Sequence, residues 1–224
     1  NSIAKRERPL HHQIHPCDKL LQHILYCEAN GDARDAQKSA EGAELQPIEI
    51  GDPRGSRDKD ADLYDTIDNK ARVEQTVRTA GFPSYAIIRP VFFMENLVSP
   101  WFLNGDKLVT AMDPNTVLQM IAVKDIGAYG ALAFTQAERF KNLELDIAGD
   151  AVTMPQAAAV LTRAYVKPIE YLRIPMSEIR KNSEDFALML EWFERVGYDA
   201  DIPGNEKAFG IRPTTLNEWS AGLR

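Results

Sequence analysis

The chain has 224 residues, which is enough to bury a core as one large domain or two small ones. Its apolar fraction of 44% and charged fraction of 26% are ordinary for a globular protein. A net charge of -7 argues against a nucleic-acid-binding surface, which needs a basic face. No stretch approaches the roughly 20 apolar residues of a membrane span, so no membrane partner is expected. With two cysteines and no signal-peptide pattern, the chain is expected in a reducing, cytoplasmic setting.

The first part of the chain is polar and carries few structural signals. All four histidines and both cysteines lie within residues 11–27, but without the CxxC or HxxxH spacing of familiar zinc sites. We therefore predict a polar arm and no metal site. Residues 44–50 read as a strand that Pro47 confines to an edge or a bulge. Residues 51–62 are densely charged and read as a solvated loop.

Residues 64–96 carry the strongest pattern. Asp68 is placed to cap a helix by accepting a backbone N–H of its first turn. Val73, Val77 and Ala80 follow at helical spacing and give the helix one apolar face. Gly81 suits the left-handed position just past a helix end, so the helix is expected to stop there.

A short buried strand is predicted directly after this helix. Residues 85–88 are apolar and rich in β-branched side chains, and Pro90 closes the run because it lacks a backbone N–H. Residues 91–96 then form an aromatic-rich loop. Ligands of open α/β sheets bind beyond the carboxyl ends of the strands, which is where this loop is expected to lie.

Alternating elements continue to the end of the chain. The patterns predict a hairpin turn at 104–106, strands at 107–110, 118–123, 143–147 and 166–174, and helices at 126–137, 154–164 and 183–196. Asp125 is expected to cap the first of these helices. Capping boxes at Thr153–Gln156 and Thr215–Glu218 each predict the start of a helix.

A further pattern within residues 70–96 is formed by Lys70, Val73-Glu74, Gly81, Ile88-Arg89-Pro90 and Phe93-Met94-Glu95-Asn96. By the spacing of these residues, the region from residue 64 to 224 resembles the NmrA-like family, atypical relatives of the short-chain dehydrogenases and reductases. The resemblance implies an α/β fold with a Rossmann-like parallel sheet and a small α+β C-terminal lobe. It divides the chain into a divergent or truncated N-terminal half at 1–63, the rest of the NAD(P)-binding domain at 64–150, and a substrate lobe at 151–224.

The resemblance also implies site residues. It puts the family's catalytic and cofactor-binding lysine at Lys70, where an ammonium would bind the nicotinamide ribose and steady negative charge on a carbonyl oxygen. Further cofactor-binding positions follow from the same resemblance. They are Asp52, near the adenine, and Phe93, Met94, Glu95 and Asn96, which line the nicotinamide pocket. The alternatives are a solvated first-turn lysine, and a segment whose Phe92 and Phe93 belong to the core.

The chain departs from the family in its N-terminal half and at one catalytic position. No Gly-rich turn of the kind that cradles a pyrophosphate occurs before residue 64. Only about eighteen residues separate Asp52 from Lys70, too few for the family's strand, helix and strand. The tyrosine that usually stands four residues before the lysine is replaced by Thr66, which is a poor proton donor.

Three hypotheses follow. The chain is an NAD(P)H-dependent reductase of a small carbonyl or quinone. Alternatively, it is a redox-sensing regulator that binds NADP or NAD and a protein partner without turnover, which Thr66 favours. The third hypothesis is a degenerate chain that binds no nucleotide, which the absence of the Gly-rich loop favours.

Overall fold

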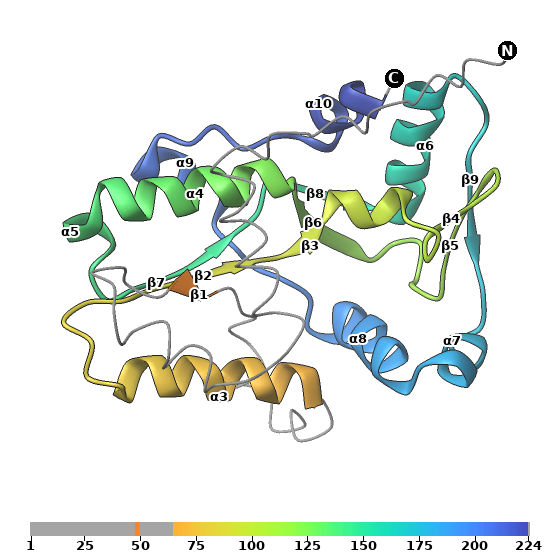
Figure 1. Ribbon diagram of the computed structural model, residues 1–224. Coiled ribbons are helices and arrows are strands. Elements are labelled where there is room, and N and C mark those ends of the chain that lie inside the picture. The colour runs from red at the N-terminus through yellow and green to blue at the C-terminus, as the bar shows by residue number, and fades with distance from the viewer. Residues whose placement is uncertain (1–47, 50–64, 224) are drawn as a thin grey trace, which may run out of the picture.

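The computed structural model of the chain describes residues 48–49 and 65–223. A parallel sheet lies at its centre, with the order β1 (Ile48–Glu49), β2 (Ala86–Pro90) and β7 (Leu143–Ile147). Helix α3 (Asp65–Thr79) covers one face of this sheet and α4 (Val123–Thr135) covers the other (Figure 1). This layered arrangement confirms the predicted α/β class with a Rossmann-like parallel sheet.

The segment from α3 to β2 has the predicted form, with one correction. Gly81 takes a left-handed φ of 78° just past the helix, and β2 follows with Ile87 and Ile88 fully buried, as predicted. The cap prediction at Asp68 is wrong, because the helix begins at Asp65 and runs through that position. The predicted apolar face is confirmed only in part: Val77 is buried and Val73 is half-buried, but Ala80 lies past the end of the helix and is exposed.

Two smaller sheets extend the central one. One has the order β3 (Phe92–Phe93), β6 (Val117–Ile121) and β8 (Asp150–Thr153), and β8 is antiparallel to β6. The other has the order β4 (Leu103–Asn104), β5 (Lys107–Thr110) and β9 (Glu170–Arg173). Gly105, with φ 64°, turns β4 into β5 and confirms the predicted hairpin.

The remaining helices surround these sheets. They are η2 (Met94–Val98), α5 (Ala137–Phe140), α6 (Met154–Tyr165), α7 (Met176–Asn182), α8 (Glu184–Arg195), α9 (Ile202–Phe209), α10 (Leu216–Ser220) and η3 (Ala221–Leu223). Both predicted capping boxes are present, at the starts of α6 and α10. Ser183 caps α8, and Gly197 stands just past its end with φ 65°.

Other predictions of local structure need correction. Asp125 is not the cap of α4, which begins at Val123, and it is buried and accepts hydrogen bonds from Thr214 instead. The strand predicted at 166–174 is confined to β9, since Val166 takes a left-handed φ of 53° as the C-cap of α6. Helices α7 and α9 were not predicted. Of the strand predicted at 44–50, Ile48–Glu49 form β1, and the rest lies outside the described residues.

Two apolar clusters form the core. The smaller one fills the space between the central sheet and α4, with Ile88, Ile121, Ile147 and Tyr129 among its members. The larger one joins Phe92, Met94 and Met120 to residues of the C-terminal part such as Leu161 and Trp192. It therefore packs residues from both sides of position 150 together, and the division of the chain at that residue stays a prediction. Among the described residues, no helix is both long enough and apolar enough to cross a bilayer.

Gly149 lies where three parts of the fold meet. Its N–H donates to the Met120 carbonyl oxygen over 2.7 Å, and a Cβ added to it would lie 2.6 Å from the Thr214 carbonyl oxygen. Since that oxygen belongs to the backbone, no side-chain rotation relieves the contact. Close approach of the 214 region therefore requires glycine at this position.

We expect Gly149→Ala to lower the free energy of unfolding by about 1–3 kcal/mol, the usual cost of forcing atoms into filled space. Gly130→Ala, in α4, is the matched control, because nothing lies within 4 Å of its added Cβ. An alanine within a helix is favoured over glycine, so this control is expected to be neutral or stabilising. Urea denaturation measures both variants, and equal stability of the two would contradict the close packing at Gly149.

Candidate functional site

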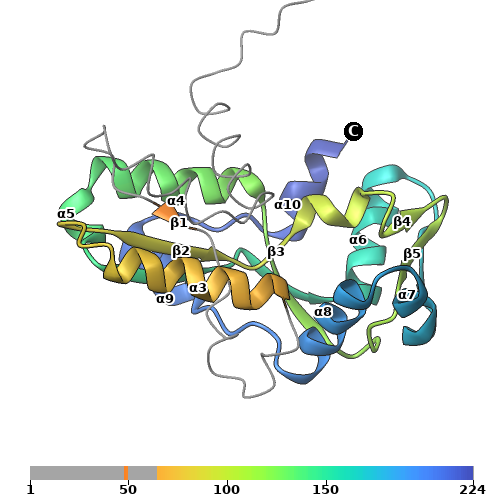
Figure 2. The same ribbon diagram turned by 60° about the horizontal axis from the view of Figure 1, so that its bottom comes forward.

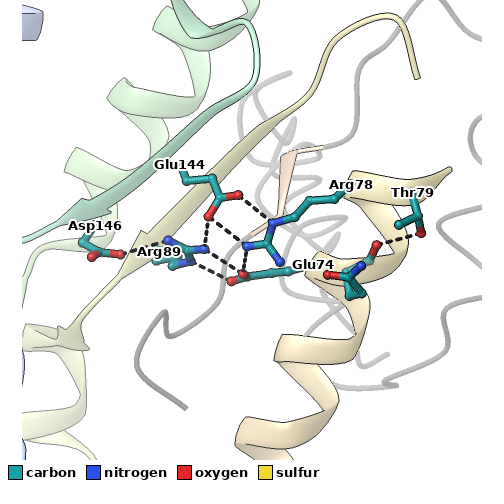
Figure 3. Close-up of polar contacts among 7 residues, drawn as sticks. Glu74, Arg78, Thr79, Arg89, Glu144 and Asp146 are labelled. Carbon is teal, nitrogen blue, oxygen red and sulfur yellow. Dashed lines mark hydrogen bonds and ion pairs between the residues drawn. The ribbon is translucent and has the colours of Figure 1, made fainter. Parts of the chain in front are cut away.

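A buried network of ion pairs fastens α3 to the central sheet (Figure 3). The Arg89 guanidinium, in β2, donates to both oxygens of Glu74 in α3, each over 2.7 Å. It also donates to Glu144 in β7, and Nη1 lies 3.6 Å from Asp146 Oδ1. Arg78, one turn after Glu74, donates to Glu144 over 2.6 and 2.8 Å and to Glu74 over 2.7 Å. Five charged side chains thus link one helix to two neighbouring strands.

The two groups at the centre of this network are shielded from water. The side chains of Arg89 and Glu74 are only 8% and 5% exposed. Their fork-to-fork contact is the bidentate geometry that makes arginine–carboxylate pairs strong and directional. A charge buried in this way depends on its partner, because removing one member leaves the other uncompensated in a low-dielectric environment.

The network also changes the titration of Glu144. Hydrogen bonds from Arg78, and then from Arg89, lower the pKa of this carboxyl from its ordinary 4.5 to about 2, against the opposing effect of partial burial. Hydrogen bonds that Arg78 and Arg89 donate to the carboxylate favour its charged form. Glu144 therefore stays ionised throughout the neutral range.

Lys70 lies one helical turn before this network in α3. Helix α3 and β2 are joined by a short turn and run in opposite directions (Figure 2). Glu74 contacts Arg89 near the carboxyl end of β2, and Lys70 precedes Glu74 by four residues, on the same face of the helix. One helical turn of about 5.4 Å places Lys70 further toward the carboxyl end of β2 than Glu74. Lys70, which is half-buried, therefore belongs to the part of α3 nearest the side of the sheet where ligands bind in α/β folds.

The segment of residues 93–96 follows the same end of β2 and contains side chains with different surroundings. Met94 is fully buried in the larger core cluster, and Phe93 is half-buried against the smaller one. Asn96 is half-buried, and its side-chain amide makes no hydrogen bond to any residue that the structure describes. Phe92 is a core residue that packs edge to face on Phe102 and Phe193. This agrees, for Phe92, with the alternative that Phe92 and Phe93 belong to the core.

Glu95 has protein donors of its own. Its Oε1 accepts the backbone N–H of Val123 over 3.1 Å and the indole N–H of Trp219 over 2.9 Å. Its Oε2 is buried without a hydrogen-bond partner. Glu95 therefore joins η2 to the start of α4 and to α10, a contact that the sequence pattern did not reveal.

Lys70 and Asn96 belong to segments at the same end of β2. The ion pairs of Glu74 hold the helix of Lys70 beside β2, and only three residues separate Pro90, the last residue of β2, from η2, which contains Asn96. Asp52 lies outside the described residues, as does the region where a Gly-rich loop is expected. The ion-pair network was missed at the sequence level. Its visible signals are an arginine within a run of buried apolar residues and the glutamate–arginine pair at positions 74 and 78.

Two hollows occur elsewhere on the part of the chain that the structure describes. One, of about 420 Å³, lies between β9, α7 and α8. Its lining residues are Ala111, Arg173, Ile174, Pro175, Met176, Glu191 and Glu194. The other, of about 320 Å³, lies between the start of α4 and the segment that leads into α10. Neither is lined by Lys70 or by residues 93–96.

Layered helices around a parallel sheet, with the segment of β3 and η2 following the carboxyl end of the central strand β2, define a Rossmann-like α/β protein. The family model of the NmrA-like family matches residues 55–220. The chain therefore belongs to the NmrA-like family, whose members include NAD(P)-binding proteins.

Solved structures of low identity share this fold. An NADPH-dependent quinone oxidoreductase from Escherichia coli is 19% identical, with a TM-score of 0.66 over 89% of this chain and 70% of its own. NmrA, a negative transcriptional regulator solved in complex with NADP, is 16% identical, with a TM-score of 0.63 over 88% of this chain and 71% of its own. A nucleoside-diphosphate-sugar epimerase from Staphylococcus aureus is 17% identical, with a TM-score of 0.62 over 93% and 73%. A comparison with curated proteins found no match.

We expect Arg89→Met to lower the free energy of unfolding by about 3–5 kcal/mol, because it removes the buried bidentate partner of Glu74 and leaves that carboxylate with Arg78 as its partner among the described residues. Arg180→Met is the control, since Arg180 pairs with Glu184 and Glu191 on the exposed surface. Exposed pairs contribute at most about 1 kcal/mol. Thermal and chemical denaturation compare the two variants, and an equally small effect of both would show that the network is not a stabilising constraint.

Stability is also expected to depend on Glu144 at acid pH. Because folding lowers the pKa of Glu144 from 4.5 to about 2, its contribution is complete above about pH 4.5 and is lost as the pH falls toward 2. Glu144→Gln should therefore flatten the dependence of the unfolding free energy on pH within this window. Glu138→Gln, an exposed carboxylate of α5 outside the network, should leave the profile unchanged. Identical slopes for wild type and Glu144→Gln would rule out this linkage.

Proposed function

We propose that the chain binds NADP or NAD at the carboxyl end of β2 and uses it in hydride transfer with a small carbonyl or quinone. The observation that carries this proposal is the position of Lys70. A buried ion-pair network joins Glu74 of its helix to Arg89 near the carboxyl end of β2, and Lys70 precedes Glu74 by one helical turn toward that end. Such a cation suits a ribose hydroxyl and a carbonyl oxygen that gains negative charge.

The described residues fit the nicotinamide end of a dinucleotide. The Asn96 amide offers a donor and an acceptor that no described residue uses, which suits a carboxamide or a ribose hydroxyl. The half-buried ring of Phe93 offers an apolar surface for a planar ring. When bound, the dinucleotide supplies the hydride, while this chain's own residues orient it and stabilise charge.

A second candidate function is that of a redox-sensing regulator that binds the dinucleotide and a protein partner without turnover. Thr66 supports it, because it replaces the tyrosine that donates the proton in short-chain dehydrogenases. The two functions share the same site and differ in turnover. Fast consumption of NAD(P)H with a carbonyl or quinone acceptor would favour the reductase, and tight binding with negligible consumption would favour the regulator.

Titration calorimetry with NADPH and NADH tests the shared binding step. Lys70→Ala is expected to weaken binding by about 10- to 100-fold, since hydrogen bonds to a charged group contribute about 1.5–3 kcal/mol. Asn96→Ala is expected to weaken it by about 3- to 10-fold, as befits a neutral hydrogen bond. The control is Lys124→Ala, an exposed lysine of α4 that is expected to bind as the wild type does. Absence of binding at millimolar nucleotide would overturn the proposal and leave the hypothesis of a chain without nucleotide binding.

A further inference from the structure

The segment at residues 212–220, here called the C-terminal strap, is attached to three separate parts of the fold. It carries α10 and passes close to η2, the short yellow-green helix that follows β3 in Figure 2. Each attachment is a hydrogen bond from the strap to a carboxylate on a different element. Thr214 donates to Asp125 of α4, Leu216 to Asp150 of β8, and Trp219 to Glu95 of η2.

The attachment at Glu95 concerns the proposed site directly. Glu95 stands between Met94 and Asn96 in η2, and Trp219 lies 124 positions further along the chain. The carboxylate holds the indole N–H and the Val123 N–H on the same oxygen. The contact therefore fixes the outward side of η2 against α4 and α10.

Helix η2 needs such external support. It is a five-residue 3-10 helix, and its N-cap residue Phe93 makes no side-chain capping bond. Helices of this kind have weaker hydrogen-bond geometry than α-helices and little stability of their own. Met94 and Leu97 anchor its inner side in the core. The side that carries Glu95 is held by the start of α4 and by the strap.

The strap is loosely packed beside its attachment to α4. The hollow of about 320 Å³ lies between the two. Its lining residues are Lys124, Asp125, Arg212, Pro213, Thr214 and Glu218. Asp125 and Thr214 meet there through hydrogen bonds, while Leu216 is the fully buried apolar anchor of the strap. Because polar contacts hold much of the strap against α4, the loss of a single hydrogen bond is expected to loosen the strap locally without unfolding the chain.

We infer that the C-terminal strap positions the nicotinamide end of the site, with Glu95 and Trp219 as its positioning residues. The inference rests on the proposed function. Glu95 acts through η2, whose position determines where the Asn96 amide is presented. The coupling is reciprocal, since a ligand that requires the ordered η2 also stabilises the contact between Glu95 and Trp219. Occupancy of the site is thereby transmitted to the C-terminal surface of the molecule.

The test compares Glu95→Ala and Trp219→Phe with Asn217→Ala. The control removes another side-chain contact of the strap, the 2.8 Å hydrogen bond from Arg163 to Asn217, which does not reach η2. Two quantities are measured for each variant. One is hydrogen exchange of the backbone amides at residues 94–98 in the absence of nucleotide, and the other is the dissociation constant for NADPH.

Glu95→Ala and Trp219→Phe are expected to speed exchange at residues 94–98 and to weaken NADPH binding. The loss of affinity is expected to be about 3- to 10-fold for Trp219→Phe, which loses one hydrogen bond, and at least as large for Glu95→Ala, which loses two. Asn217→Ala should match the wild type in both. Glu95→Gln should restore most of the affinity, because its amide oxygen still accepts from both donors. Rescue by this variant is not expected if the carboxylate charge itself contacts the nucleotide.

The outcomes separate the inference from the proposed function. Unchanged exchange at residues 94–98 in both variants overturns the inference, as does NADPH affinity equal to that of the wild type. If the wild type binds no nucleotide, the proposed function is overturned, and the positioning role is overturned with it. This holds even if hydrogen exchange shows that the strap stabilises η2. Faster exchange together with weaker binding, and rescue by Glu95→Gln, supports both.

Discussion

The contact between Arg89 and Glu74 is the constraint on which the site depends. It places a charged pair in the interior, joined to Arg78, Glu144 and Asp146, and so fixes α3 in both distance and rotation relative to β2 and β7. Apolar contacts at a residue such as Val77 are not directional, so they would allow the helix to sit on the sheet in several positions. A bidentate ion pair is directional and allows only one position. Lys70 takes its place from that single position of the helix.

Much of the fold could be predicted from local chemistry, and the failures have identifiable causes. Capping boxes, the turn at Gly81 and the apolar run of β2 act within a few residues, so the pattern alone reveals them. The cap prediction at Asp125 failed, and the contact of Glu95 with Trp219 was not foreseen, because the hydrogen-bond partners lie 89 and 124 positions away. Periodicity carries no information about such distant contacts. The same limit hid the ion-pair network, although two of its members, Glu74 and Arg89, belong to the residues that carry the family resemblance.

The candidate site combines a part held by ion pairs with a part held by the C-terminal strap. Lys70 belongs to a helix fastened by charged pairs, while Asn96 belongs to a short helix held by the core on one side and by the C-terminal strap on the other. A protein that only stores a nucleotide needs no such division. For a regulator, it offers a route from the nucleotide to the surface, and for a reductase, it offers a part that can yield when product leaves.

The parallel pairing of the central sheet has a consequence for how the chain folds. β2 lies between β1, which precedes it by 38 positions in register, and β7, which follows it by 57. Each pairing closes a long loop before any hydrogen bond of the sheet forms, and this loss of chain entropy slows folding. The pairs α7–α8 and α6–β9 are close in sequence and have no such barrier. The C-terminal part is therefore expected to acquire structure first, and the carboxyl end of β2, with its lysine and its amide, is assembled last.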